Sequence, residues 1–162
     1  MQKKEERSMI YAAEDRKSED DYSYLPKLFD VIDHGQLQYN WLITACEFNM
    51  ANRIEDEYFA RGYCWISGEE LTAVVQEKDI QWIWAILSGF EKDIPFEKVM
   101  EHSLPDFIDG AEISTIIHPL AKVQIIAQDS SSTQFFSTEA ELVSKFRAGY
   151  PQSEDITDDS AK

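Results

Sequence analysis

One apolar segment constrains the fold of this chain more than any other. Residues 79–87 read Asp-Ile-Gln-Trp-Ile-Trp-Ala-Ile-Leu, with apolar side chains at both odd and even positions. Successive side chains of a β-strand point to opposite faces of the sheet, so this pattern indicates a strand that is covered on both sides. We therefore predict a central strand here, ended by Ser88-Gly89, and a sheet built around it.

Other segments of the chain supply further strands and several helices. Runs rich in β-branched and aromatic residues predict strands at 39–48, 62–67, 111–117, 122–128 and 133–137. Apolar spacing and capping residues predict helices at 23–33, 68–76, 95–102 and 139–149. We expect Ser67 or Gly68 to cap the second helix, and Thr138 with Glu141 to form a capping box on the last.

The spacing of the strands predicts how they pair. The last three strands follow one another too closely for crossover helices, so they should pair antiparallel. The sequence therefore predicts an α+β fold in a single domain, with a mixed or mainly antiparallel β-sheet and helices packed mostly on one face.

Composition divides the chain into one domain and two tails. A chain of 162 residues is expected to form one domain. Residues 1–22 are polar and mixed in charge, so we expect a flexible N-terminal arm whose removal leaves the fold intact. The α+β domain is predicted to span 23–150, and 151–162 to form an acidic C-terminal tail.

The net charge limits the partners that the chain can have. The sequence has 31 Asp and Glu against 15 Lys and Arg, a formal net charge of −16. The stretch 55–112 alone holds fourteen acids and four bases. Such a field repels nucleic acid and anionic membranes and attracts basic molecules. We therefore expect a basic protein partner, no direct nucleic-acid binding and no membrane association.

Motifs for catalysis, cofactors and targeting are missing from the sequence. There is no P-loop, no dinucleotide fingerprint and no nucleophile elbow. The histidines, His34, His102 and His118, lack the spacing of a helical metal-binding pair, and Cys46 and Cys64 lie in apolar runs typical of buried thiols. We predict no catalytic residue, no metal and no cofactor. Without a secretory signal or an apolar run of 18 residues, the expected location is the cytoplasm.

Aromatic residues and acids together suggest a recognition surface. Trp82 and Trp84 are two residues apart in a predicted strand, so we expect them on one face, either as core residues or as an exposed aromatic patch. Acids beside an aromatic side chain are suited to binding a basic protein. The candidate partner-binding residues are Glu55, Asp56, Glu57, Trp65, Glu69 and Glu70.

A set of features resembles a group of small bacterial proteins. The features are Tyr39-Asn40-Trp41, the segment 62–68, the Trp82/Trp84 strand, and the turn at 129–133 before a last helix and an acidic tail. Over roughly residues 37–156, the chain resembles small acidic cytosolic proteins of Gram-positive bacteria, some of which are similar to immunity proteins of polymorphic toxin systems. This resemblance implies an acidic surface that mimics the substrate of a cationic nuclease toxin and plugs its site.

The sequence leads to one main functional hypothesis and two alternatives. The main hypothesis is a non-enzymatic acidic binding protein, such as an immunity-type inhibitor of a basic nuclease toxin. The first alternative is a nucleic-acid mimic that blocks a DNA-binding protein. The second is an enzyme or small-ligand binder, which a cavity holding a perturbed carboxylate beside a histidine would favour. The acidity could also serve solubility alone.

Overall fold

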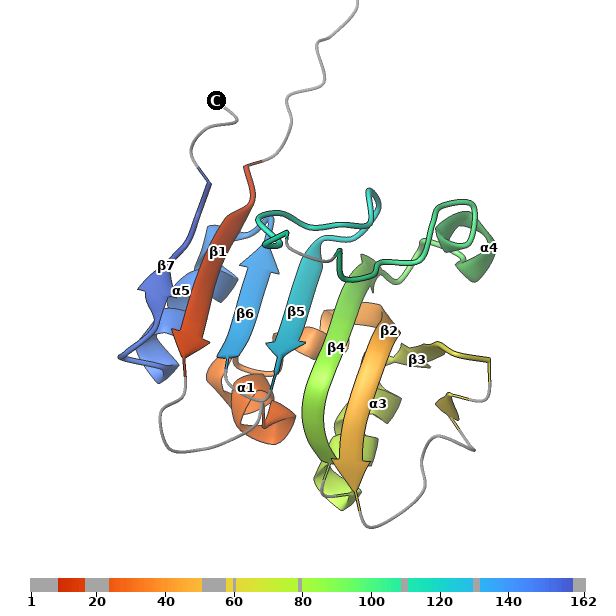
Figure 1. Ribbon diagram of the computed structural model, residues 1–162, viewed down its shortest axis with the longest axis horizontal. Coiled ribbons are helices and arrows are strands. Elements are labelled where there is room, and N and C mark those ends of the chain that lie inside the picture. Colours follow the sequence, from red (N-terminus) through yellow and green to blue (C-terminus); the bar gives the residue numbers. More distant parts are fainter. Residues whose placement is uncertain are drawn as a thin grey trace, which may run out of the picture.

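A computed structural model describes residues 9–16, 24–50, 58–59, 61–78, 80–108, 111–129 and 132–158 (Figure 1). These residues form one seven-stranded sheet with helices α1, α3 and α5 behind it in the view of Figure 1. Every strand pairing is antiparallel. The predicted α+β class is therefore confirmed, and the sheet is antiparallel rather than mixed.

The strands lie in the order β3-β2-β4-β5-β6-β1-β7 across the sheet. Their bounds are β1 Tyr11–Arg16, β2 Tyr39–Met50, β3 Cys64–Ser67, β4 Ile80–Glu91, β5 Val123–Gln128, β6 Ser132–Ser137 and β7 Glu154–Asp155. The helices are α1 Leu25–Val31, the 3₁₀-helix η1 Gly35–Gln38, α3 Gly68–Glu77, α4 Phe96–Val99 and α5 Ala140–Gly149.

Both faces of the sheet are covered, each by a different kind of structure. On the helix face, side chains such as Trp41, Trp82 and Phe135 form one buried cluster with residues of α1, α3 and α5. On the opposite face, Phe90 and Phe136 form a second cluster with residues of the connection 92–122, which includes α4. We call this second side the connection face.

The central strand is correctly predicted, but its end is not. β4 lies between β2 and β5 and contributes buried residues to both clusters. It continues through Ser88-Gly89 to Glu91, where the sequence suggested a break. A Cβ at Gly89 would lie 3.0 Å from the indole of Trp41, so the glycine makes room for that ring on the neighbouring strand. Glycine within a strand often marks such a close approach.

A β-bulge separates the two tryptophans of β4. Glu47 and Phe48 are adjacent in β2 but pair with Trp84 and Trp82, so β4 carries one extra residue between the tryptophans. Trp82 is buried in the helix-face cluster. Trp84 is half-buried and contacts Phe107 of the connection, with ring centroids 5.0 Å apart. The prediction that the two rings share a face is wrong, because a bulge shifts the alternation of side chains.

Part of the N-terminal segment 1–22 belongs to the sheet. Residues Tyr11–Arg16 form β1, which pairs with β6 over six residues and also pairs with β7. Ala12 and Ala13 are almost completely buried. The prediction of a flexible arm at 1–22 is therefore wrong for 11–16, and residues 1–8 and 17–22 lie outside the described part of the chain.

The C-terminal segment also joins the sheet. β7 pairs with β1, and the backbone N–H of Ile156 donates to the carbonyl of Ala12 at 3.0 Å. The backbone N–H of Ala12 in turn donates to the Thr157 hydroxyl at 3.0 Å. Within the described residues, the predicted acidic tail is thus bound to the edge of the domain as far as Thr157.

Two local predictions fail for identifiable reasons. Residues 111–117 form no strand; the Gln124 side chain instead bonds the backbone N–H of Ile117 and the carbonyl of Thr115, which holds this segment over the sheet. The last helix has no capping box with Thr138, because the backbone N–H of that residue donates to Lys122 beside the sheet. By contrast, Ser67 caps α3 as predicted, accepting from the backbone N–H of Glu70 at 3.1 Å.

Candidate functional site

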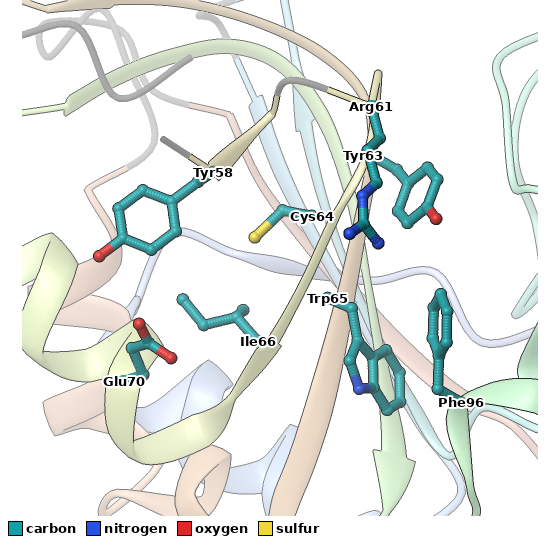
Figure 2. A pocket seen from close by; sticks show the side chains of 8 residues that line it. All are labelled: Tyr58, Arg61, Tyr63, Cys64, Trp65, Ile66, Glu70 and Phe96. Carbon is teal, nitrogen blue, oxygen red and sulfur yellow. The ribbon is translucent and has the colours of Figure 1, made fainter. Parts of the chain in front are cut away.

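A hollow of about 510 Å³ surrounds the edge strand β3 (Figure 2). We call it the β3 hollow. Its lining residues are Tyr58, Arg61, Tyr63, Cys64, Trp65, Ile66, Glu70 and Phe96. It includes two of the residues that the sequence suggested for partner binding, Trp65 and Glu70.

The local sequence explains how β3 places these side chains. Gly62 has φ +82°, a left-handed conformation that glycine adopts without strain, and the strand starts two residues later. β3 pairs with β2 from Cys64 to Ser67, and its side chains alternate between the two faces. Ser67 then caps α3, which places Glu69 and Glu70 in the first helical turn.

Aromatic rings line the hollow on the connection face. Trp65 is half-buried and packs against Phe90 and Phe96, with ring centroids 5.7 and 5.4 Å apart. Tyr63 stacks on Phe96 at 6.2 Å. Figure 2 shows Tyr63, Trp65 and Phe96 together on one side of the strand. These rings form a partly exposed aromatic group in mutual contact.

The two charged residues of the lining, Arg61 and Glu70, have opposite signs, and both are exposed. The side of the hollow away from the rings is apolar at its base and carries the Glu70 carboxylate at its rim. Cys64 and Ile66 are buried, and Glu70 at the start of α3 is exposed (Figure 2). Burial raises the pKa of the Cys64 thiol to about 12, and Glu70 adds to the effect. The thiol is therefore protonated at neutral pH, and it is not an activated nucleophile.

Not every predicted residue lies in the β3 hollow. Glu69 is exposed, but its carboxylate accepts a hydrogen bond from the Lys92 ammonium, which lowers the pKa of Glu69. That ion pair reduces the contribution of Glu69 to an acidic surface. Glu55, Asp56 and Glu57 lie outside the described residues, so their role stays a prediction.

Sequence reasoning missed some of the lining residues. Tyr63 could have been found, since it lies two positions before Trp65 and therefore on the same face of the strand. Phe96 could not, because it comes from α4, and the path of the connection 92–122 sets its position. Arg61 could not be placed without the turn at Gly62.

A second hollow, of about 500 Å³, lies on the connection face over β1, β5 and β6. Its most buried charged residue is Glu14, whose two oxygens accept from Arg16 Nε at 2.8 Å and from Gln134 Nε2 at 2.7 Å. Ser132 and Gln128 are among the other lining residues. Its described lining contains no histidine. The carboxylate–histidine pair that would favour an enzyme is thus not formed by the described residues of this hollow.

His118 is a structural residue of the connection. It is buried, and its Nε2 lies 2.9 Å from the carbonyl of Val99 while its Nδ1 accepts from the backbone N–H of Leu120 at 3.1 Å. This pattern fits a neutral ring with its proton on Nε2. Burial lowers the pKa of His118, and the nearby His102 acts in the same direction, while the Val99 bond opposes it.

We expect His118 to make the domain less stable as the pH falls. Its pKa in the folded protein lies below the ordinary value of 6.5, so below that pH the unfolded chain binds more protons than the folded one. The free energy of unfolding of the parent, measured with urea between pH 7.5 and 5, should therefore fall faster than that of His118→Gln.

His34→Asn provides a control for the replacement of a histidine as such. His34 is exposed and has a left-handed backbone that asparagine tolerates, so this variant should be about as stable as the parent at pH 7.5. A difference in the free energy of unfolding between the parent and His118→Gln that stays the same at every pH would contradict a neutral, buried ring at position 118.

Three further findings concern metal sites, membrane-spanning helices and similarity to known proteins. Among the described residues, no three His, Cys, Asp or Glu side chains come together as a metal site. None of the helices in the described part of the chain is long and apolar enough to cross a membrane. Comparisons with protein-family models, with curated proteins and with solved structures find no match.

Proposed function

We propose that this chain is a non-enzymatic acidic binding protein whose β3 hollow binds a basic protein, such as a nuclease toxin that it would inhibit. The observation that carries this proposal is the meeting of Trp65 and Glu70 at one partly open hollow. An apolar centre enriched in aromatic residues, surrounded by a polar rim, is the usual anatomy of a protein interface.

The net charge supports a basic partner. A formal charge of −16 draws a cationic protein toward the domain and speeds its encounter. Exposed acids lie close in sequence to Phe96: Glu91 is the last residue of β4, Asp93 follows it, and Glu97 comes after Phe96 in α4. Two exposed bases, Lys92 and Lys98, alternate with them. These carboxylates provide the long-range attraction, whereas short-range contacts in the β3 hollow would hold the partner.

The aromatic group supports a protein partner over a small ion or a metal. Trp and Tyr are enriched among the residues that dominate binding energy in interfaces. The ring of Trp65 packs against those of Phe90 and Phe96. Because these contacts already restrict the ring, the loss of side-chain entropy when a partner binds should be small. The net charge supports equally the alternative of a nucleic-acid mimic that blocks a DNA-binding protein. The identity of the bound partner distinguishes that alternative from an inhibitor of a nuclease toxin.

Photo-crosslinking in living cells tests the proposal. A photoreactive benzoylphenylalanine replaces Tyr63 in the hollow, and in a matched variant it replaces Tyr24, an exposed tyrosine beside α1. We expect a covalent adduct with a basic protein from position 63 and not from position 24. Mass spectrometry of the adduct separates a nuclease toxin from a DNA-binding protein.

Two outcomes would contradict the proposal. One is the absence of any adduct at position 63 above the level of the Tyr24 variant. The other is an adduct at position 63 with acidic or neutral proteins alone, which would remove the electrostatic basis of the argument.

A further inference from the structure

Side chains from both faces of β3 line the β3 hollow. Four successive residues, 63–66, all line it. Because neighbouring side chains of a strand point to opposite faces, a cavity lined by all four must pass around the edge of β3. Figure 2 shows this directly, with Cys64 and Ile66 on one side of the strand and Tyr63 and Trp65 on the other.

The backbone of β3 lies at the centre of this hollow. β3 is the terminal strand of the sheet, and it pairs with β2 along one side only. Among the described residues, no other strand pairs with its outer side. A terminal strand directs alternate N–H and C=O groups away from its neighbour, and these groups can pair with another chain.

We propose that the outer edge of β3 accepts an extended basic segment of the partner as an additional strand of the sheet. This inference rests on the proposed function, since it names how the partner binds at the same hollow. Backbone hydrogen bonds would give affinity, and pockets on the two faces would read alternate side chains.

The two sides of β3 define the chemistry of that segment. Side chains on one face of the added strand would meet the rings of Tyr63, Trp65 and Phe96, which suit apolar groups. Side chains on the other face would meet Tyr58, Ile66 and the exposed carboxylate of Glu70, which suit lysine or arginine. The one base of the lining, Arg61, lies on the side of Tyr63 and Trp65, away from that carboxylate (Figure 2). The segment therefore alternates apolar and basic residues.

Charge argues against a second copy of this chain as the occupant. Two copies would bring formal charges of −16 together along one edge, with Glu70 of each chain near the contact. Like charges across an interface are unfavourable, whereas a basic segment gains from the same field. We therefore commit to a heterologous basic strand, and a homodimer becomes an outcome of the test.

The test uses a defined probe and a backbone-blocked control. The probe is an eight-residue peptide of alternating lysine and valine, and the control is the same peptide with every backbone amide N-methylated. The control keeps the side chains and charge but cannot donate backbone hydrogen bonds. Binding to the full chain is measured by titration, and amide hydrogen exchange is followed by NMR over residues 63–67.

The expected result has two parts. The probe should bind at least about 10-fold more tightly than the methylated control, because several backbone hydrogen bonds are lost in the control. Alternate amides of β3 should exchange more slowly when the probe is bound, since only those facing outward gain a partner.

Other results overturn the inference in distinguishable ways. Equal binding of both peptides, with a shifted Trp65 indole signal and unprotected amides, would overturn strand addition but leave the proposed function standing. No binding of either peptide at the hollow would also overturn strand addition, and the adducts at position 63 decide the proposed function independently. Protection of β3 that grows with protein concentration alone would show that the occupant is a second copy.

Discussion

A protein that lacks residues 1–16 is expected to lose its cooperative unfolding transition, whereas one that begins at Met9 should keep it. The difference between the two is little more than β1, which lies between β6 and β7. Its removal would take six residue pairs from β6 and leave that strand with an unpaired edge next to the buried rings of Phe135 and Phe136. β7 would lose its pairing partner as well.

The expected size of this effect is large. Loss of an internal strand should cost more than about 4 kcal/mol, a large part of the stability of a typical domain. Thermal and urea unfolding, followed by far-UV circular dichroism, measure it directly. A truncated protein that unfolds within about 2 °C of the one beginning at Met9, which corresponds to less than about 1 kcal/mol, would show that β1 contributes little.

Replacement of Trp82 by alanine is expected to destabilise the domain far more than replacement of its neighbour Trp84. Trp82 is 2% exposed and lies in the helix-face cluster, so its removal should leave a cavity and cost roughly 3–5 kcal/mol. Urea unfolding of the purified variants measures this cost.

Trp84→Ala is the matched control for the Trp82 substitution. Trp84 lies two residues away, is half-buried and contacts Phe107, so its replacement should cost only about 1–2 kcal/mol. Equal losses from the two variants would contradict the β-bulge and the assignment of the rings to opposite faces.

Regular patterns explain which parts of the fold could be predicted. β4 could be found because its apolar residues occupy both alternating sets, and α3 because Ser67 precedes a run with acids in its first turn. These signals are local. The antiparallel pairing of β5 and β6 followed from the short turn between them.

The parts that could not be predicted depend on contacts between distant residues. β1 contains Glu14 and Asp15, so its sequence is typical of a polar arm. In the sheet, however, the Gln134 side chain of β6 donates a hydrogen bond to the Glu14 carboxylate, which stabilises this acid in a buried position. The bulge beside Trp84 depends on the register with β2 and has no signature in β4 alone. Local sequence cannot carry such information.

The candidate site was half predictable for the same reason. Trp65 and Glu70 are separated only by the short link from β3 to α3, so a strand followed by a helix already brings them near one another. Phe96, whose ring packs against Trp65, belongs to the connection 92–122. The path of this connection depends on how it packs over the connection face of the sheet. The hollow therefore becomes visible only in three dimensions.

The most direct test of the central claim is the association rate of this protein with the basic protein crosslinked at position 63, measured by stopped flow between 0.01 and 0.15 M salt. The Debye length falls from about 30 Å to about 8 Å over this range, so steered association should slow by about 10-fold or more. Glu70→Lys should slow it further, and Trp65→Ala should mainly speed dissociation. Glu141→Lys, which reverses an exposed acid on α5, is the control and should change the rate much less. An association rate that responds neither to salt nor to the reversal at Glu70, or responds equally to the reversal at Glu141, would contradict the account.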